Sequence, residues 1–206
     1  MEPTTSPNSQ HPMTRDKPFG WLLLVTGMVG WLASGALSLE KLAAFKDPNH
    51  VTSCDINPWV SCGKVMQTWQ SSLFGFPNMF IGIVAFAVII TTGMAVLSGA
   101  RLARWYWLGL QGGVTLGFVF TVWLWSQALY SINVLCPWCM VVWAAMIPLF
   151  VWTTLRNTTH RVITLPAGIA RHGAYFGWII TVALYLAVVA TIGFAFSHVF
   201  MGGSGL

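Results

Sequence analysis

The amino-acid sequence predicts an all-α integral membrane protein, and its composition and hydropathy carry that prediction. Of the 206 residues, 56% are hydrophobic and only 7% are charged, whereas an ordinary soluble domain is about 25% charged. The mean hydropathy is +0.69. The twelve Trp suit a bilayer, whose interfaces favour this side chain. Ten basic residues are too few for a phosphate-binding stripe. The composition therefore argues against a soluble enzyme, a disordered protein and a nucleic-acid binder.

Five apolar stretches follow an N-terminal segment, 1–18, that is polar and contains several prolines and that we expect to be a disordered cytoplasmic tail. Each stretch is near the roughly 20 residues that a helix needs to cross hydrocarbon. The stretches cover 19–39, 77–97, 105–130, 136–155 and 175–198. The first is longer than the roughly 7–15 apolar residues of a signal peptide, so we predict a retained helix, with cleavage near 33–36 as the alternative. Residues 156–173 are predicted to be a cytoplasmic linker. Residues 199–206 are a tail that resembles an expression linker.

The basic residues are distributed unequally between the two sides of this topology. Lys and Arg concentrate in cytoplasmic loops, and one side carries seven of them against three on the other. The richer side holds Arg15, Lys17, Arg101, Arg104, Arg156, Arg161 and Arg171. We therefore predict a multi-pass protein of the cell membrane with a cytoplasmic N-terminus. The C-terminus and the loops 41–76 and 131–135 then lie on the outer side.

Two spacing patterns predict local structure. In the outer loop, an i, i+1, i+4, i+8 spacing places four apolar residues on one helical face: Val65, Met66, Trp69 and Leu73. This pattern predicts a short amphipathic helix over 64–74, lying at the membrane interface. In the third stretch, glycines recur at every fourth residue: Gly109, Gly113 and Gly117. Such a small-residue ridge predicts close packing against a neighbouring helix.

The four cysteines are the most informative residues in the chain. Cys54 and Cys62 lie in the outer loop, and Cys136 and Cys139 form the motif CPWC at the start of the fourth apolar stretch. By the predicted topology all four thiols lie at the same, outer face. Disulfides form and persist outside a bacterial membrane, so the position of the cysteines is compatible with redox chemistry.

The motif CPWC has a specific physical rationale. Pro137 suits the first position of a helix, where no backbone N–H is needed. Cys136 is then placed near the N-cap, where the helix dipole favours a thiolate. Cys139 is one turn further along and on the same face, so the two sulfurs can approach bonding distance. A dithiol between water and the apolar bundle suits electron transfer from a soluble thiol to a membrane-soluble acceptor.

Two structural interpretations compete with redox chemistry. Four cysteines can hold zinc, but here one pair is separated by seven residues and the other is embedded at a helix start. Two static disulfides are the stronger alternative, because the pair in the loop alone would look like an ordinary staple. The five histidines are scattered without an i, i+4 pair, and we predict no metal site.

Three segments resemble the vitamin K epoxide reductase family, especially its actinobacterial members: SCDINPWVSCGKVM, FGFPNMFIG and LCPWCMVVW. The resemblance covers about 19–155. It implies a four-helix transmembrane bundle around a quinone, with the fifth helix added to it. In bacterial relatives a fifth helix commonly leads to a thioredoxin-like domain. No further cysteine follows that helix here, so we expect the thioredoxin-fold partner to be a separate exported protein.

The resemblance also implies a role for each cysteine. Cys54 would exchange with the dithiol of the partner, and Cys62 would pass the electrons to Cys136. Cys139 would reduce the quinone, for which menaquinone is our expectation, and then form a disulfide with Cys136. Asn78 matches the position whose amide hydrogen-bonds a quinone oxygen in the family; a helix-start amide is the alternative.

Other residues have less specific patterns. Trp143 follows Cys139 by four residues on the same helical face and is a candidate quinone contact; animal relatives carry Tyr there, which weakens any inference about epoxide reduction. Met66 and Phe74 are candidates to cap the quinone pocket, although contact with lipid explains them equally well. Two carboxylates remain. Asp55 would either hold the loop or be solvated, and Glu40 would extend to the outer interface unless it is functional.

We therefore predict a membrane thiol-disulfide oxidoreductase. It would reoxidise an exported thioredoxin-fold protein that forms disulfides, and pass the electrons to a quinone. Reduction of a quinone epoxide by the same cysteines is the alternative among enzymes. A non-catalytic membrane protein with two structural disulfides is the alternative from a different class.

Overall fold

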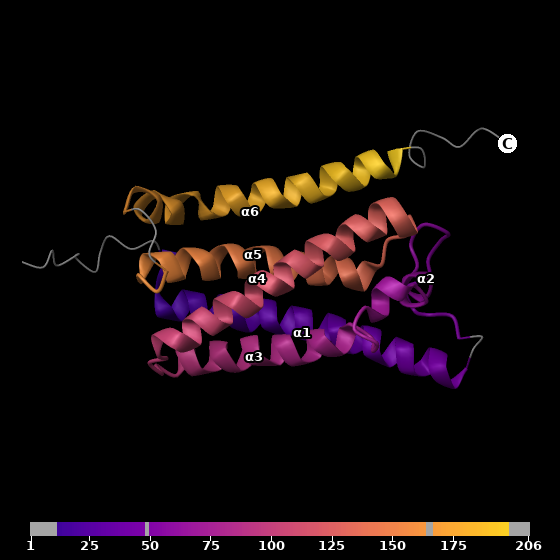
Figure 1. The fold of residues 1–206 in the computed structure, drawn as a ribbon, viewed down its shortest axis with the longest axis horizontal. Helices are drawn as coiled ribbons and strands as arrows, with labels where there is room; N and C mark the ends of the chain where they lie inside the picture. Colours follow the sequence, from indigo (N-terminus) through magenta and orange to yellow (C-terminus); the bar gives the residue numbers. More distant parts are fainter. Residues whose placement is uncertain (1–11, 48–49, 164–166, 198–206) are drawn as a thin grey trace, which may run out of the picture.

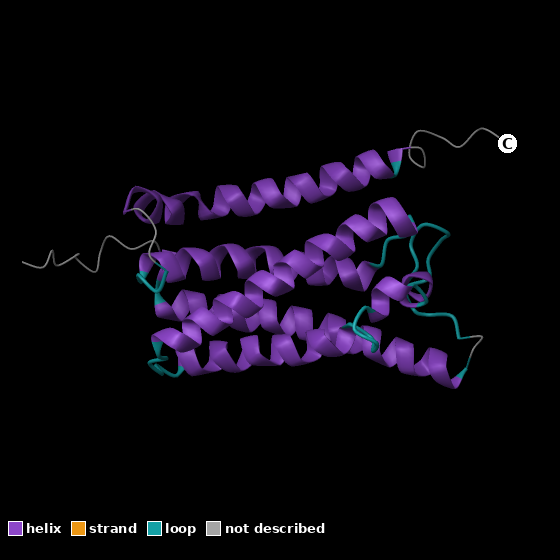
Figure 2. Cartoon of the chain, in the orientation of Figure 1, coloured by secondary structure: helices purple, strands orange, loops and turns teal. Residues whose placement is uncertain are grey.

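The computed structural model describes residues 12–47, 50–163 and 167–197, with side chains undescribed over 167–175. Its elements are almost entirely helical (Figures 1 and 2). In chain order they are the 3-10 turn η2 (Pro12–Thr14), α1 (Asp16–Lys46), α2 (Cys62–Met66), the 3-10 turn η3 (Trp69–Ser72), α3 (Met79–Leu97), α4 (Arg104–Gln127), the π-helical turn η4 (Ala128–Ile132), α5 (Pro137–Thr159) and α6 (Ala167–Ala195). Five segments are long and apolar enough to cross a membrane, which confirms a helical membrane protein with five spans.

Four of these helices form a bundle, and the fifth lies along its side. The long helix α1 packs on α3 and α5, while α4 packs on α5. The last helix, α6, contacts α5 and runs beside it at the edge of the bundle (Figure 1). This arrangement agrees with the predicted four-helix bundle plus an additional helix.

The contact between α1 and α3 depends on small residues. A Cβ atom placed on Gly93 of α3 would lie 2.9 Å from the backbone nitrogen of Leu24 and 3.0 Å from the carbonyl oxygen of Gly20. Backbone atoms are therefore in contact across this interface, as expected for membrane helices that associate by close packing. A larger side chain at position 93 would force α1 and α3 apart.

The contact between α5 and α6 uses a proline. Pro148 lies inside α5 and has no N–H to donate to the carbonyl of Ala144. The Tyr185 hydroxyl on α6 donates to that carbonyl oxygen at 2.6 Å. In hydrocarbon an unsatisfied carbonyl costs several kcal/mol, so this bond both satisfies the backbone and docks α6.

Several predicted boundaries differ from the structure. Residues 12–14 form a 3-10 turn and α1 already begins at Asp16, so this part of the predicted disordered tail is ordered, and α1 continues beyond position 39 to Lys46. The predicted linker 156–173 is shorter, because α5 extends to Thr159 and α6 begins at Ala167. The predicted tails at 1–11 and 199–206 lie outside the described residues.

The predicted single helix over 64–74 is wrong. The helix ends at Met66, and Thr68 adopts an extended conformation before η3 begins. Hydrogen bonds from Asn78, just outside this segment, hold its second half. The Asn78 amide nitrogen donates to the carbonyl oxygen of Gln70 at 2.6 Å, and the amide oxygen accepts from the N–H of Leu73 at 3.2 Å. Apolar periodicity alone contains no information about such side-chain bonds to the backbone.

Candidate active site

Backbone pairing holds the outer loop against the turn that precedes α5. The N–H of Ser61 donates to the carbonyl oxygen of Leu135 at 2.9 Å, and the N–H of Leu135 donates to that of Trp59 at 2.8 Å. Cys62 directly follows one side of this pairing and Cys136 follows the other. Two cysteines that are 74 positions apart in the sequence are thereby placed opposite each other at one end of the bundle.

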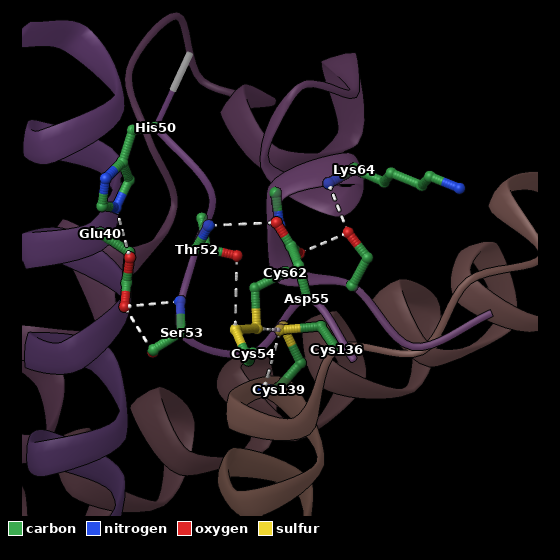
Figure 3. Close-up of a disulfide and its surroundings, with 12 residues drawn as sticks. Glu40, His50, Thr52, Ser53, Cys54, Asp55, Cys62, Lys64, Cys136 and Cys139 are labelled. Carbon is green, nitrogen blue, oxygen red and sulfur yellow. Dashed lines mark hydrogen bonds and ion pairs between the residues drawn. A yellow bond between two sulfur atoms is a disulfide. The ribbon is translucent and has the colours of Figure 1, made fainter. Parts of the chain in front are cut away.

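The sulfur atoms are arranged for thiol-disulfide exchange (Figure 3). Cys54 and Cys62 form a disulfide with a Cα–Cα distance of 5.6 Å, whereas Cys136 and Cys139 are free. The sulfur of Cys136 lies 3.4 Å from that of Cys62. Exchange proceeds by attack of a thiolate on one sulfur of a disulfide, so the Cys136 sulfur already has its electrophile within contact distance.

The start of α5 stabilises the thiolate form of Cys136. Cys136 is the N-cap and Pro137 begins the helix, as the motif predicts. The backbone N–H of Cys139 donates to the Cys136 sulfur at 3.4 Å. Hydrogen bonding from the Cys139 thiol, followed by that from the backbone, lowers the pKa of the Cys136 thiol, although burial opposes this shift. Cys136 lies just before the membrane-spanning helix, so a thiolate at this position is close to the aqueous face.

Asp55 holds the loop around Cys62. Its carboxylate accepts from the Ser61 hydroxyl at 2.6 Å, the Gly63 N–H at 3.0 Å and the Thr52 N–H at 3.1 Å. Burial raises the pKa of Asp55, but these hydrogen bonds together outweigh it and leave the pKa below its ordinary value. Of the two predicted roles, the structure confirms the one in which Asp55 holds the loop.

Glu40 anchors the other end of the same loop. Its carboxylate accepts from both the N–H and the hydroxyl of Ser53 and pairs with His50 at 2.9 Å (Figure 3). The prediction that Glu40 simply extends to the membrane interface is therefore wrong. Ser53 is the neighbour of Cys54, so Glu40 fixes the position of the disulfide relative to α1.

A cavity of about 550 Å³ extends from the free cysteines into the bundle. Its lining is predominantly apolar and is contributed by α1, α3, α4, α5 and the segment of η3. Both Cys136 and Cys139 line it, and so do the predicted residues Asn78, Met66 and Trp143. Asn78 is one of the few polar residues in the lining. Its amide nitrogen carries two hydrogens, and the described contacts use only one of them.

The structure differs from the sequence-based expectations for Phe74 and for the glycines of α4. Phe74 does not line it; its ring is 58% exposed and lies against Phe120, with 5.8 Å between centroids. The glycine ridge of α4 meets a neighbouring helix only at Gly117, where an added Cβ would lie 3.2 Å from the Met146 side chain of α5. Gly109 and Gly113 have no atom within 4 Å of an added Cβ, and with Gly117 they line the cavity. The ridge provides space for a ligand, which is a function that its spacing could not distinguish from packing.

A comparison with protein-family profiles matches residues 21–154 to the vitamin K epoxide reductase family, which is more than half of the chain. The chain belongs to this family. A comparison with curated proteins gave no significant match. The vitamin K epoxide reductase family comprises membrane oxidoreductases that use a quinone and typically act with a thioredoxin-like partner. This chain is accordingly a multi-pass membrane oxidoreductase of that family.

The residues present fit a quinone. The cavity is predominantly apolar and has room for a quinone ring, and two free cysteines and the amide of Asn78 are among its lining residues. No group of three or more His, Cys, Asp or Glu side chains is arranged to hold a metal ion within the described ranges.

Proposed function

We propose that this protein oxidises the dithiol of an exported thioredoxin-fold protein and transfers the two electrons to a quinone, for which menaquinone is our first candidate. The proposal rests chiefly on one observation: the Cys62 and Cys136 sulfurs are 3.4 Å apart, and Cys136 and Cys139 line the apolar cavity. The four sulfurs form a continuous path from the outer loop to the interior of the bundle.

The first exchange takes place at Cys54. This residue keeps 6% of its surface exposed, whereas Cys62 is fully buried, so an external thiolate meets Cys54 first. Attack on the Cys54 sulfur breaks the Cys54–Cys62 bond and releases Cys62 as a thiolate. The second thiol of the partner then displaces Cys54, and the partner leaves in its oxidised form. Both electrons are now held by Cys54 and Cys62.

The second exchange uses the contact between Cys62 and Cys136. When Cys136 and Cys139 are oxidised, the Cys62 thiolate attacks the Cys136 sulfur and displaces Cys139. Cys54 then attacks Cys62, which restores the Cys54–Cys62 disulfide and frees Cys136. The result is the combination found in the structure, a disulfide in the loop and two free thiols at α5.

The last step occurs in the cavity. When bound, a quinone would take up the two electrons and two protons that the Cys136 and Cys139 thiols release as they form a disulfide, and it would leave as a quinol. Cys139 lies in the cavity wall and supplies the electrons as it forms a disulfide with Cys136. Asn78 has a spare amide hydrogen and would orient a quinone oxygen toward Cys139. Trp143 and Met66 would contact the ring from the apolar wall.

The test is quinone reduction by the purified protein, driven by a dithiol, in comparison with Cys139→Ala. We expect turnover by the wild type and none detectable for the variant, while an unchanged unfolding temperature of the variant reports an intact fold. Phe74→Ala is a matched control outside the cavity and should retain activity. If the folded wild type reduces no quinone, the cysteines are structural staples and the proposal is wrong.

The outward orientation of the loop is part of the same proposal and has a separate test. A membrane-impermeant alkylating reagent applied to intact cells should label a cysteine introduced at Ile56, which is 70% exposed in the loop. A cysteine introduced at Ser98, at the other end of the bundle, should be protected. The reverse pattern would show the opposite orientation.

A further inference from the structure

A second pocket lies at the end of the bundle opposite the cysteines, where α1 begins, α3 connects to α4 and α5 ends (left in Figure 1). Its volume is about 330 Å³, and it shares no lining residue with the cavity at the cysteines. Four guanidinium groups and one carboxylate line it: Arg101, Arg104, Arg156, Arg161 and Asp16. The pocket is thus strongly basic in a chain that has few charged residues.

Arg156 is the central residue of this pocket and is incompletely paired. Only 8% of its side chain is exposed, and its Nη2 donates to Asp16 at 3.1 Å. Its Nε and Nη1 are buried without a hydrogen-bond partner among the described residues. Buried donors are nearly always satisfied, and those of a charged group are costly to leave unpaired. The pocket therefore lacks an acceptor at Arg156.

The surroundings fix the guanidinium of Arg156 in place. It lies 3.7 Å from the centroid of the Trp107 ring and 5.1 Å from that of Phe19, so cation–π contacts hold its plane. Arg104 is also fixed, because its Nε and Nη2 both donate to the carbonyl oxygen of Val162, at 3.2 and 3.1 Å. Two planar groups with fixed orientation are suited to binding the oxygens of a phosphate.

The two remaining arginines are available to a ligand. Arg101 and Arg161 are exposed, and their guanidinium groups have no ion-pair or hydrogen-bond partner in the part of the chain that the structure describes. Asp16 balances only one of the four charges, and 68% of its side chain is exposed. Val96 and Leu102 add apolar surface to the lining. The lining thus combines excess positive charge with a surface that tolerates hydrocarbon.

The position of the pocket along the membrane normal is the level at which lipid headgroups lie. It is formed at the ends of spanning helices, and Trp105, next to Arg104, is 75% exposed. Trp side chains favour the membrane interface. Basic pockets between transmembrane helices bind anionic headgroups. We infer that this pocket binds a phosphate group with net negative charge, as carried by an anionic glycerophospholipid, with Arg156 and Arg101 as ligands.

The experiment titrates the full-length protein in non-ionic detergent with dioleoylphosphatidylglycerol and follows the unfolding temperature. We expect a saturable rise that dioleoylphosphatidylcholine at the same concentration does not produce. A parallel titration with inorganic phosphate identifies the source: a rise with the lipid alone assigns the site to a headgroup, and a rise with both assigns it to phosphate in general. No rise with either, or equal rises with both lipids, would overturn the inference.

Variants locate the effect in the pocket. Arg101→Ala should weaken phosphatidylglycerol binding about fivefold, the equivalent of about 1 kcal/mol for one basic residue near a charged surface. Lys46→Ala removes the same charge from the opposite end of α1 and should change the affinity less than twofold. Equal losses in the two variants would indicate general electrostatic attraction and contradict a site.

A gain of affinity provides a test that misfolding cannot imitate. Asp16→Asn removes the one carboxylate of the pocket and should strengthen phosphatidylglycerol binding about fivefold. Arg156→Gln should abolish the saturable rise if the variant folds. Should that variant not fold, Asp16→Asn and Arg101→Ala decide the question, since unchanged affinity in both would overturn the inference.

Discussion

The two cysteine pairs reach the same meeting point by different structural means. Cys136 and Cys139 are positioned by the first turn of a helix, with Pro137 as its first residue. Cys54 and Cys62 lie on an irregular loop that is positioned by two carboxylates, Asp55 and Glu40. The helix start orients its dithiol with bonds inside one turn, whereas the loop is held by carboxylates whose partners lie up to thirteen positions away. The comparison predicts that substitutions will affect the two pairs separately.

The largest expected effect concerns the contact between the two pairs. A variant that keeps only Cys62 and Cys136, made by Cys54→Ala with Cys139→Ala, should form a disulfide completely under mild oxidation, because these sulfurs are 3.4 Å apart. The complementary variant, Cys62→Ala with Cys136→Ala, should remain reduced. Mass spectrometry after alkylation measures both. Equal oxidation of the two variants would remove the distinction between the pairs.

The next effect should be confined to the cavity side. Gly113→Leu places a side chain in the cavity, where no atom lies within 4 Å of an added Cβ. We expect the KM for a lipid quinone to rise about tenfold, which corresponds to about 1.4 kcal/mol, with the rate of Cys54–Cys62 reduction unchanged. Gly35→Leu is the matched control, because that glycine is equally open and does not line the cavity.

A smaller effect should be confined to the loop side. Asp55→Asn weakens three hydrogen bonds to a carboxylate and should destabilise the loop by about 2 kcal/mol at neutral pH. The folded structure lowers the pKa of Asp55, so its contribution is complete above the ordinary Asp pKa and is lost as pH falls through the lowered value. The protection of the backbone amides over 50–66 against hydrogen exchange, relative to the intrinsic rate at each pH, should therefore fall in acid for the wild type but not for the variant. Identical acid profiles would contradict this role.

The smallest effect concerns the cap of α2. The Ser61 hydroxyl accepts from the N–H of Lys64 at 3.0 Å while it donates to Asp55. Ser61→Ala should cost about 1 kcal/mol of loop stability, less than Asp55→Asn, and should leave quinone affinity unchanged. The same hydrogen-exchange measurement compares the two. A larger loss for Ser61→Ala than for Asp55→Asn would place the main anchor at Ser61.

The sequence predicts those features that depend on local pattern. Length and hydropathy predict the five spans, and the motif CPWC predicts Cys136 as an N-cap, because both are properties of neighbouring residues. Contacts between distant segments are not encoded in this way. Glu40 bonds with Ser53, thirteen positions away, and no spacing rule distinguishes that carboxylate from one at the membrane interface. The resemblance in sequence motifs, rather than pattern, connected the loop to α5.

The glycines of α4 also show that a sequence pattern alone does not determine how a surface is used. A ridge of Gly109, Gly113 and Gly117 has one sequence signature and two structural uses, a surface for a helix or a surface for a ligand. Which one applies depends on whether another helix occupies the adjacent space. Here that space belongs to the cavity at Gly109 and Gly113, whereas Gly117 lies against Met146 of α5, so the expectation of packing was wrong for the first two glycines.

The backbone pairing of Ser61 and Trp59 with Leu135 constrains how this protein can vary in length. Side chains alternate in direction along an extended segment, so one residue inserted between Val60 and Cys62 would turn the sulfur of Cys62 away from Cys136. Insertions near Val51, which is 73% exposed and precedes both the disulfide and the turn that bonds Ile56 to Val60, would leave that register intact. Viable homologues should therefore differ in loop length before Cys54 and keep a constant interval from Cys54 to Cys62, as an alignment can test.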